Sequence, residues 1–177
     1  MTAHFDPNRV SFFRLDEWSV AVCAWRGCCI EVFSRAEHSV ADCLRHLASA
    51  GVPLGKDALN PFGGNRLKAL RACIEQQDFG VHGRAALRRM KEWERVDELR
   101  AHLAHGEVKA TADGISVRHI AFDGKTETRH PQKTYTRLAM LHVLADIEAA
   151  QKSLHHQLGQ IKTLALKKAS NSGSNPG

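Results

Sequence analysis

The chain has 177 residues, of which 43% are hydrophobic and 25% charged, and this balance predicts a folded domain with an apolar core. No apolar run reaches the ~18 residues that a membrane-spanning helix needs, and the first residues lack the basic start and apolar middle of a signal peptide. We therefore expect a protein of the cytoplasm with no membrane partner, and its net charge of +6 favours an anionic partner. The five cysteines form no paired Cys-x-x-Cys motifs, which predicts buried thiols rather than disulfides.

The first predicted element is one long helix over residues 16–50. Asp16 is its expected N-cap, and Gly51 and Pro53 end it. Apolar or small residues recur at steps of three and four along one stripe: Trp18, Val22, Trp25, Cys29, Val32, Ala36, Val40, Cys43 and Leu47. Gly27 interrupts good helix formers, which predicts a close helix contact at that point.

Two shorter helices follow a loop rich in glycine and proline. The first covers residues 65–77 with Asn65 as its expected cap, and "DFGVHG" separates it from the second, over 84–105. The buried side of this third helix is expected to carry Leu87, Met90, Val96, Leu99 and Leu103. Gly106 is the expected stop, because the residue after a helix end often has positive φ.

The hydrophobic period then changes from that of a helix to that of strands. Two Asp-Gly pairs, at 113–114 and 123–124, predict hairpin turns between two or three short strands, with a bulge near His119. A final helix is predicted from Thr134 onward, with a stripe formed by Met140, Leu144, Ile147, Leu154, Leu158 and Ile161 and with Gln151 as its polar exception.

Together these elements predict a mainly α protein, an up-and-down helical bundle of about four helices with a small β-hairpin insert before the last helix. Residues 1–15 form an N-terminal extension, and residues 16–165 the helical domain, whose β insert covers about 107–129. Residues 166–177 are expected to be a flexible tail.

The candidate site is Arg100 and His105, five residues apart at the end of the third helix. An ideal helix separates them by ~7.5 Å along its axis and about 140° around it, so they can converge on a ligand where the last turn opens. Histidine exchanges protons near neutral pH, and arginine clamps phosphate through two parallel hydrogen bonds, which is the chemistry of RNA cleavage without metal. The alternative is a capped helix end, with His105 bonded to a carbonyl. In that case Arg100 pairs with nearby carboxylates, those of Glu94, Asp97 or Glu98.

Five further residues of this helix are expected to support the site or to bind RNA: His102, Glu98, Arg95, Arg89 and Arg88. His102 lies four residues after Glu98, so the two side chains can pair directly. A solvated helix face is the alternative interpretation of the arginines.

His102 and His105 also have the spacing of two zinc ligands, but no third ligand follows closely. We therefore expect no metal and no cofactor.

The helix end "LRAHLAHG" and the order of the elements resemble the HEPN superfamily (higher eukaryotes and prokaryotes nucleotide-binding domain). The hallmark of that family is an arginine, four to six residues and a histidine near a helix end of an up-and-down bundle. The resemblance covers residues 16–165, and "EVKATADGISV" is similar to a strand insert that some members carry.

The resemblance implies a metal-independent endoribonuclease, as in toxin–antitoxin or phage-defence systems, that acts as a homodimer with the two motifs meeting across the interface. Arg100 would hold the scissile phosphate and His105 would be the acid and base. The products would be a 2′,3′-cyclic phosphate and a 5′-hydroxyl. RNA is the implied substrate, and an antitoxin or another operon-encoded protein is the implied partner.

Two residues depart from the family pattern. Ala101 stands where active members usually have a polar residue, commonly asparagine, and His102 is the neighbour that could compensate. Glu107 stands where some members carry a tyrosine that a partner enzyme modifies. Since the family includes non-catalytic members, the second hypothesis is a module that binds RNA or a protein without cleaving. A purely structural oligomerisation domain is the third.

Overall fold

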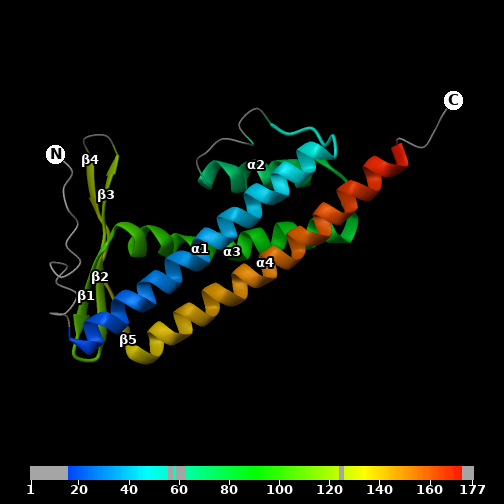
Figure 1. Cartoon of the computed structure of the whole chain (residues 1–177). Helices are drawn as coiled ribbons and strands as arrows, with labels where there is room; N and C mark the ends of the chain where they lie inside the picture. Colours follow the sequence, from blue (N-terminus) through cyan, green and yellow to red (C-terminus); the bar gives the residue numbers. More distant parts are fainter. Residues whose placement is uncertain (1–15, 56–57, 59–62, 124–125, 173–177) are drawn as a thin grey trace, which may run out of the picture.

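The computed structural model describes residues 16–55, 58, 63–123 and 126–172 (Figure 1). The helices are α1 (Glu17–Ser49), α2 (Gly63–Gln76), α3 (Gly80–His105) and α4 (Arg137–Ser172). The strands are β1 (Glu107–Thr111), β2 (Gly114–Arg118), β3 (Ile120–Asp123), β4 (Thr126–Arg129) and β5 (Lys133–Thr136). The prediction of a mainly α fold of about four helices with a small β insert before the last is confirmed. The predicted N-terminal extension lies outside the described residues.

Helix α1 begins and faces the core as its sequence predicts. The Asp16 carboxylate accepts a hydrogen bond from the Ser19 amide at 2.9 Å, so Asp16 is the N-cap. The predicted stripe is buried apart from Trp18 at its edge, which is half-buried. Phe33 and Leu44, which the stripe omits, are fully buried as well. Each fully buried side chain of this size stabilises the fold by about 1.5–3 kcal/mol.

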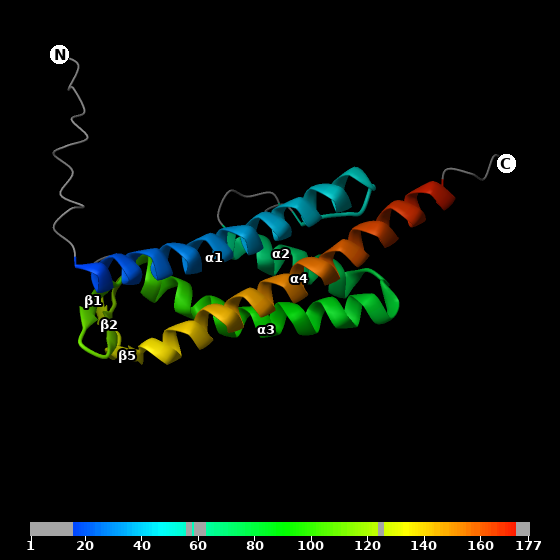
Figure 2. The ribbon, with the colours of Figure 1, turned by 60° about the horizontal axis from the view of Figure 1, so that its bottom comes forward.

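The first and last helices lie side by side and run in the same direction (Figures 1 and 2). Near their starts, the Trp25 indole donates to the Met140 carbonyl at 2.8 Å. Near their ends, the Lys162 ammonium lies 2.7 Å from the Asp42 carboxylate. Helix α4 therefore packs along most of α1.

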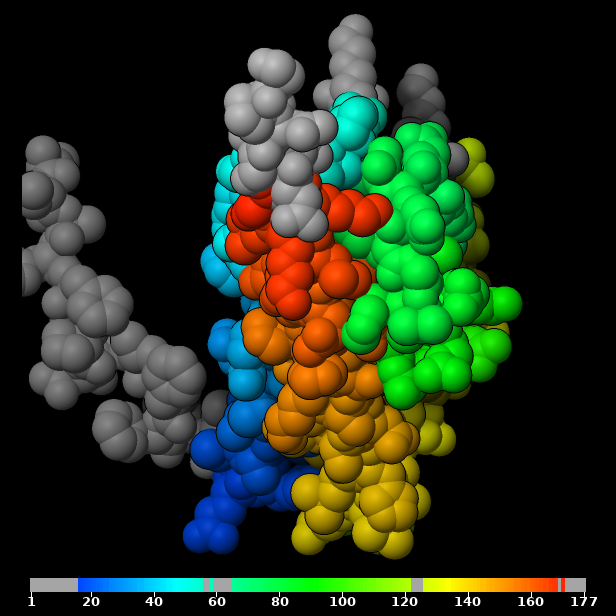
Figure 3. All heavy atoms as spheres, turned by 90° about the vertical axis from the view of Figure 1, so that its right-hand side faces the viewer, coloured from blue at the N-terminus to red at the C-terminus, as the bar shows by residue number. Residues whose placement is uncertain are grey.

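Helix α3 runs in the opposite direction to α1 and α4 (Figures 1 and 2). Figure 3 shows α4 between α1 and the first turns of α3 on one face of the molecule. The core between the helices includes an edge-on pair of Phe33 and Trp93, with ring centroids 5.6 Å apart. Trp93 is buried, although the predicted inner side of this helix omitted it.

Several predicted boundaries and contacts are wrong. Helix α2 begins at Gly63, so Asn65 lies inside it and is not its cap. Helix α3 begins at Gly80 rather than Arg84. The amide of Gly80 donates to the Asp78 carboxylate at 2.9 Å, and its φ of 55° is one that glycine adopts without strain. A Cβ at the exposed Gly27 would meet nothing within 4 Å, so no close helix contact is present there.

The predicted start of the last helix at Thr134 is also wrong, because Thr134 belongs to β5. This strand pairs antiparallel with β2, with Tyr135 opposite Ile115. Helix α4 then runs to Ser172, so residues 166–172 are helical where a tail was expected. No helix in the described part of the chain combines the length and hydropathy needed to cross a membrane.

The strands form two small sheets at the end of the bundle where α3 ends and α1 and α4 begin (Figure 1). One has the order β1-β2-β5, and the other is the β3-β4 pair. The Trp18 indole donates to the Thr111 carbonyl at 2.9 Å and thereby joins α1 to the first sheet. His119 lies between β2 and β3, and the His130 amide donates to its carbonyl at 3.0 Å, so these two histidines form the base of the β3-β4 hairpin.

All five cysteines are free thiols. Cys29, Cys43 and Cys73 are buried as predicted, whereas Cys23 and Cys28 are exposed. Burial raises the pKa of the Cys29 and Cys43 thiols to about 12, which makes them unreactive.

Candidate functional site at the end of helix α3

The chain turns directly from α3 into β1 at Gly106. Its φ of −77° and ψ of 153° are extended, so the expected positive φ is wrong. The glycine is required for a different reason, since a Cβ there would collide with the carbonyl oxygen of His102 and lie 3.0 Å from that of Arg118. Strand β2 therefore packs closely against the helix end, and His105 is the last helical residue beside this contact.

Arg26 of α1 caps the end of α3. Its guanidinium donates to the carbonyls of Leu103 at 2.6 Å, Ala104 at 3.1 Å and Gly106 at 3.3 Å. The last carbonyls of a helix have no partner inside the helix and carry partial negative charge, so the arginine both binds and neutralises them. The sequence signal for this role is an arginine inside the apolar stretch "WSVAVCAWRGCCIEVF", and only the tertiary structure shows what it binds.

Arg100 lies one turn earlier, between two carboxylates. Its Nη1 is 2.7 Å from Glu37 of α1, and its Nε is 3.3 Å from Asp97. The pair with Asp97 is one that the alternative of a capped helix end predicted for Arg100. The closer partner, Glu37, comes from another helix and was not predicted. Burial raises the pKa of Asp97, while the charge of Arg100 lowers it. The Arg100 side chain remains 39% exposed, so solvent reaches it.

His105 is exposed on the last turn of α3. It lies close enough to His119 for its charge to lower the pKa of that imidazole. No hydrogen bond or ion pair joins Arg100 to His105 within the described residues. The structure thus places both at the helix end, with Arg100 held toward α1 and His105 near the base of the hairpin.

The expected supporting residues separate into two groups. His102 is buried near the site, and its Nδ1 lies 3.2 Å from the backbone carbonyl of Glu98, not from the carboxylate that was expected to pair with it. Arg88 and Arg89 instead share Glu92, at 4.0 Å and 2.6 Å.

At 1.5 Å per residue, Arg89 lies about 24 Å along the helix from His105. Arg88 and Arg89 are therefore not part of the helix-end site. Arg95 is an exposed residue between the two groups.

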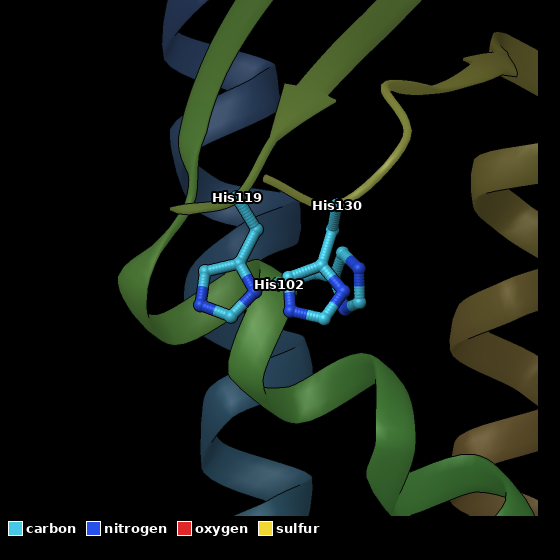
Figure 4. A group of neighbouring side chains, drawn as sticks. All are labelled: His102, His119 and His130. Atoms are coloured by element: carbon cyan, nitrogen blue, oxygen red, sulfur yellow. The ribbon is translucent and has the colours of Figure 1, made fainter. Parts of the chain in front are cut away.

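Two further histidines that the sequence analysis did not assign lie beside His102. The ring centroids are 5.0 Å apart for His102 and His119, 5.3 Å for His102 and His130, and 4.8 Å for His119 and His130. Figure 4 shows the side chains of His119 and His130 extending from the base of the hairpin toward the helix that carries His102. One nitrogen of each residue lies within 4.8 Å of the others, and we call the three residues the histidine cluster.

Two members of the histidine cluster, His102 and His119, lie in surroundings that favour the neutral imidazole. Burial first, and then neighbouring positive charges, lower the pKa of both His102 and His119. The Nδ1 of His119 is buried and has no hydrogen-bond partner among the described residues. These three side chains are the ones that could hold a metal ion in the described part of the chain.

Two pockets lie near the histidine cluster and near Arg100. A pocket of about 260 Å³ beside the histidine cluster is lined by Arg118, His119, Ile120, Arg129, His130 and Gln132. A larger one, of about 440 Å³, is lined in part by Glu37, His38, Arg45 and Arg66. Since Glu37 also binds Arg100, this second pocket adjoins the arginine of the motif.

No known protein-family model, no curated protein and no solved structure matches this chain.

Proposed function

We propose that this protein is a metal-independent endoribonuclease of the HEPN type that cleaves RNA at the end of helix α3. The observation that carries the proposal is that Arg100 and His105 lie, both accessible to solvent, on the last two turns of a bundle helix that ends at Gly106. RNA cleavage needs an acid–base group near neutral pH and a fixed cation for the phosphate, and these two side chains supply them.

In the proposed reaction, the 2′-oxygen of the RNA attacks the neighbouring phosphorus. His105 removes the proton of the 2′-hydroxyl, and Arg100 donates hydrogen bonds to the non-bridging oxygens as their negative charge grows. The bond from phosphorus to the 5′-oxygen breaks, and that oxygen receives a proton from the imidazolium. The products are a 2′,3′-cyclic phosphate and a 5′-hydroxyl, with no metal in the reaction.

Arg26, which caps α3, reduces the electrostatic repulsion between a phosphate and the end of this helix. A helix C-terminus repels anions, because its free carbonyls carry partial negative charge. Arg26 binds two of these carbonyls, those of Leu103 and Ala104, and also the carbonyl of Gly106 directly after the helix, so a phosphate can approach the last turn of α3 at lower cost.

The ion pair between Arg100 and Glu37 also opposes phosphate binding, and the free energy of this pair determines by how much. Both side chains are more than a third exposed, at 39% for Arg100 and 36% for Glu37. Exposed ion pairs contribute only about 0–1 kcal/mol, so a substrate phosphate can replace the carboxylate at small cost. In the free protein, Glu37 therefore holds Arg100 in place without blocking it.

We further propose that the protein forms a homodimer in which the two motifs face each other, as the resemblance implies. An antitoxin or another operon-encoded protein would be a further partner. Val20, Leu138 and Leu141 are 48%, 62% and 63% exposed near the starts of α1 and α4, the end of the bundle where α3 finishes. Burying such side chains favours association. Light scattering on the purified protein should give twice the mass of 19.6 kDa.

A non-catalytic module that binds RNA or a protein partner is the second candidate. It is favoured by the two carboxylates on Arg100 and by Ala101 directly after it. The two candidates share the surface and differ in whether RNA is cut.

The deciding experiment incubates total RNA with the wild type, His105→Ala and Arg100→Ala, with EDTA in every reaction. His156→Ala is the matched control, because His156 is an exposed histidine on α4, away from Leu138 and Leu141. We expect cyclic phosphate ends from the wild type and the control, and none from the two site variants.

Bound but intact RNA, with affinity that falls steeply as salt is added, would support the binding module instead.

A further inference from the structure

We propose that His102, His119 and His130 bind one divalent transition-metal ion, with zinc as the best match. The ion would join the end of α3 to the base of the β3-β4 hairpin. This inference goes beyond the ribonuclease proposal and does not depend on it, since the proposed cleavage uses Arg100 and His105.

The first argument is convergence. His119 lies seventeen residues after His102, and His130 a further eleven, yet one nitrogen of each lies within 4.8 Å of the others. Nitrogens bound to a tetrahedral zinc ion at about 2.0–2.1 Å lie about 3.4 Å apart. The nitrogens would therefore have to approach one another by up to about 1.4 Å to convert the observed cluster into a coordination site.

The second argument is the protonation of His102. Its Nδ1 lies 3.2 Å from the carbonyl oxygen of Glu98, and a carbonyl only accepts hydrogen bonds. The proton must therefore be on Nδ1, which leaves the lone pair of Nε2 available to a metal. A metal-bound histidine usually donates a hydrogen bond from the N–H of its second ring nitrogen to a backbone carbonyl, a carboxylate or water, because this bond fixes the tautomer and the ring orientation.

The third argument is the unpaired nitrogen of His119. The residue is only 7% exposed, and its Nδ1 has no hydrogen-bond partner among the described residues. Leaving a buried polar atom unpaired costs about 1–3 kcal/mol, so such atoms are rare in folded proteins. A metal at the centre of the histidine cluster gives this nitrogen a partner.

The surrounding charges allow a cation. Arg118 and Arg129 line the adjacent pocket, but Arg118 lies 2.6 Å from Glu107 and Arg129 lies 2.5 Å from Glu127. Each arginine is therefore paired with a carboxylate, although Lys109 shares Glu107 with Arg118 at 3.2 Å. Lys133 is a further described cation whose charge reaches His102. Three imidazoles suit zinc, copper, nickel and cobalt, and they leave a fourth position for water on the side of the pocket.

The position of the cluster gives the ion a structural role. Strands β3 and β4 form a sheet of their own, separate from β1-β2-β5. An isolated two-stranded hairpin is only marginally stable in water. The ion would fix this hairpin against the helix that carries His105.

The test uses protein from which any polyhistidine tag has been cleaved, dialysed against zinc and then against buffer. Elemental analysis should find one zinc ion per chain in the wild type and in His105→Ala. His119→Ala and His130→Ala should each bind zinc at least about 100-fold more weakly, because each removes a ligand. The exposed helix residues His142 and His156 provide controls, and His142→Ala and His156→Ala should retain the ion.

Cobalt gives a second readout, since a tetrahedral cobalt site absorbs visible light. The wild type should show this absorption, and His130→Ala should not. Circular dichroism verifies the fold, and His130, half-buried at the base of the hairpin, is the variant least expected to unfold.

The proposal would be overturned if the wild type bound no zinc and showed no visible absorption with cobalt. It would also be overturned if His119→Ala and His130→Ala bound zinc as tightly as the wild type. Loss of RNA cleavage in His105→Ala with zinc retained would show that the two functions are separate.

Discussion

The guanidinium of Arg100 on α3 lies 2.7 Å from the carboxylate of Glu37 on α1. This pair links the helix that carries the motif to the first helix of the bundle. It also places a carboxylate where the proposed reaction needs a phosphate, so Glu37 competes with the substrate for the same cation.

Glu37→Gln should therefore strengthen RNA binding. Removing a competing exposed ion pair releases up to about 1 kcal/mol, which corresponds to about fivefold in the dissociation constant. Fluorescence anisotropy with a labelled RNA measures it.

Glu31→Gln is the matched control, since Glu31 lies on the same helix and pairs with the exposed Arg35 at 3.4 Å. Both variants lose one negative charge, so equal tightening in the two would assign the effect to overall charge and not to Arg100.

Gly106→Ala should destabilise the fold by about 2–3 kcal/mol, because the new Cβ collides with the backbone carbonyl of His102, which cannot move aside as a side chain can. Gly27→Ala should do the opposite and stabilise by about 1 kcal/mol, since its Cβ meets nothing and alanine favours helix. Urea unfolding of both variants checks these signs. Stability unchanged in Gly106→Ala would contradict the close packing of β2 on the helix end.

Arg26→Met should cost about 2–3 kcal/mol of stability, because three carbonyls at the end of α3 lose a charged donor. Arg35→Met on the same helix should change stability by less than about 0.5 kcal/mol, as expected for a surface residue. Thermal unfolding measures both. If the two substitutions had equal effects, the cap would have no special role.

The Asp42–Lys162 pair predicts a dependence of stability on pH. The hydrogen bond from Lys162 is the main cause that holds the pKa of Asp42 below its usual value. A carboxyl whose pKa is lowered in the folded state stabilises the fold above its unfolded pKa of about 3.9 and loses this contribution as pH falls through the folded value.

Asp42→Asn should thus lower the free energy of unfolding by about 1 kcal/mol at pH 7, and this difference should shrink as the pH falls through the lowered pKa of Asp42. Denaturant titrations across this range test it. Glu148→Gln, which affects an exposed pair on α4, should show little effect at any pH.

Local patterns were enough to predict most of the helical frame. Asp16 caps α1 through a side chain three residues from its partner, and α3 ends at His105 as the following glycine indicated. Strand β5 was missed because four residues next to a helix carry too little periodicity, and what makes them a strand is pairing with β2. Long-range pairing of this kind is not contained in a local pattern.

The candidate site was predictable only in part. Arg100 and His105 share one helix end, so their spacing was visible in the sequence. Glu37 and the histidines of the hairpin come from other elements. His119 faces His130 because the register pairs Ile120 with Arg129, and both reach His102 only once the hairpin lies against α3. The sequence shows the residues of such a cluster but not the register that joins them.

The packing of α4 along α1 has a consequence for synthesis. The contacts between these helices extend from Trp25 and Met140 to Cys43 and Leu158, so α1 is covered by α4, a helix that is synthesised later. Chains grow from the N-terminus at about 5–20 residues per second, and exposed apolar surface favours aggregation in the meantime. The apolar stripe of α1 therefore remains uncovered by α4 for several seconds of synthesis, and we expect the nascent chain to be most prone to aggregation in this interval.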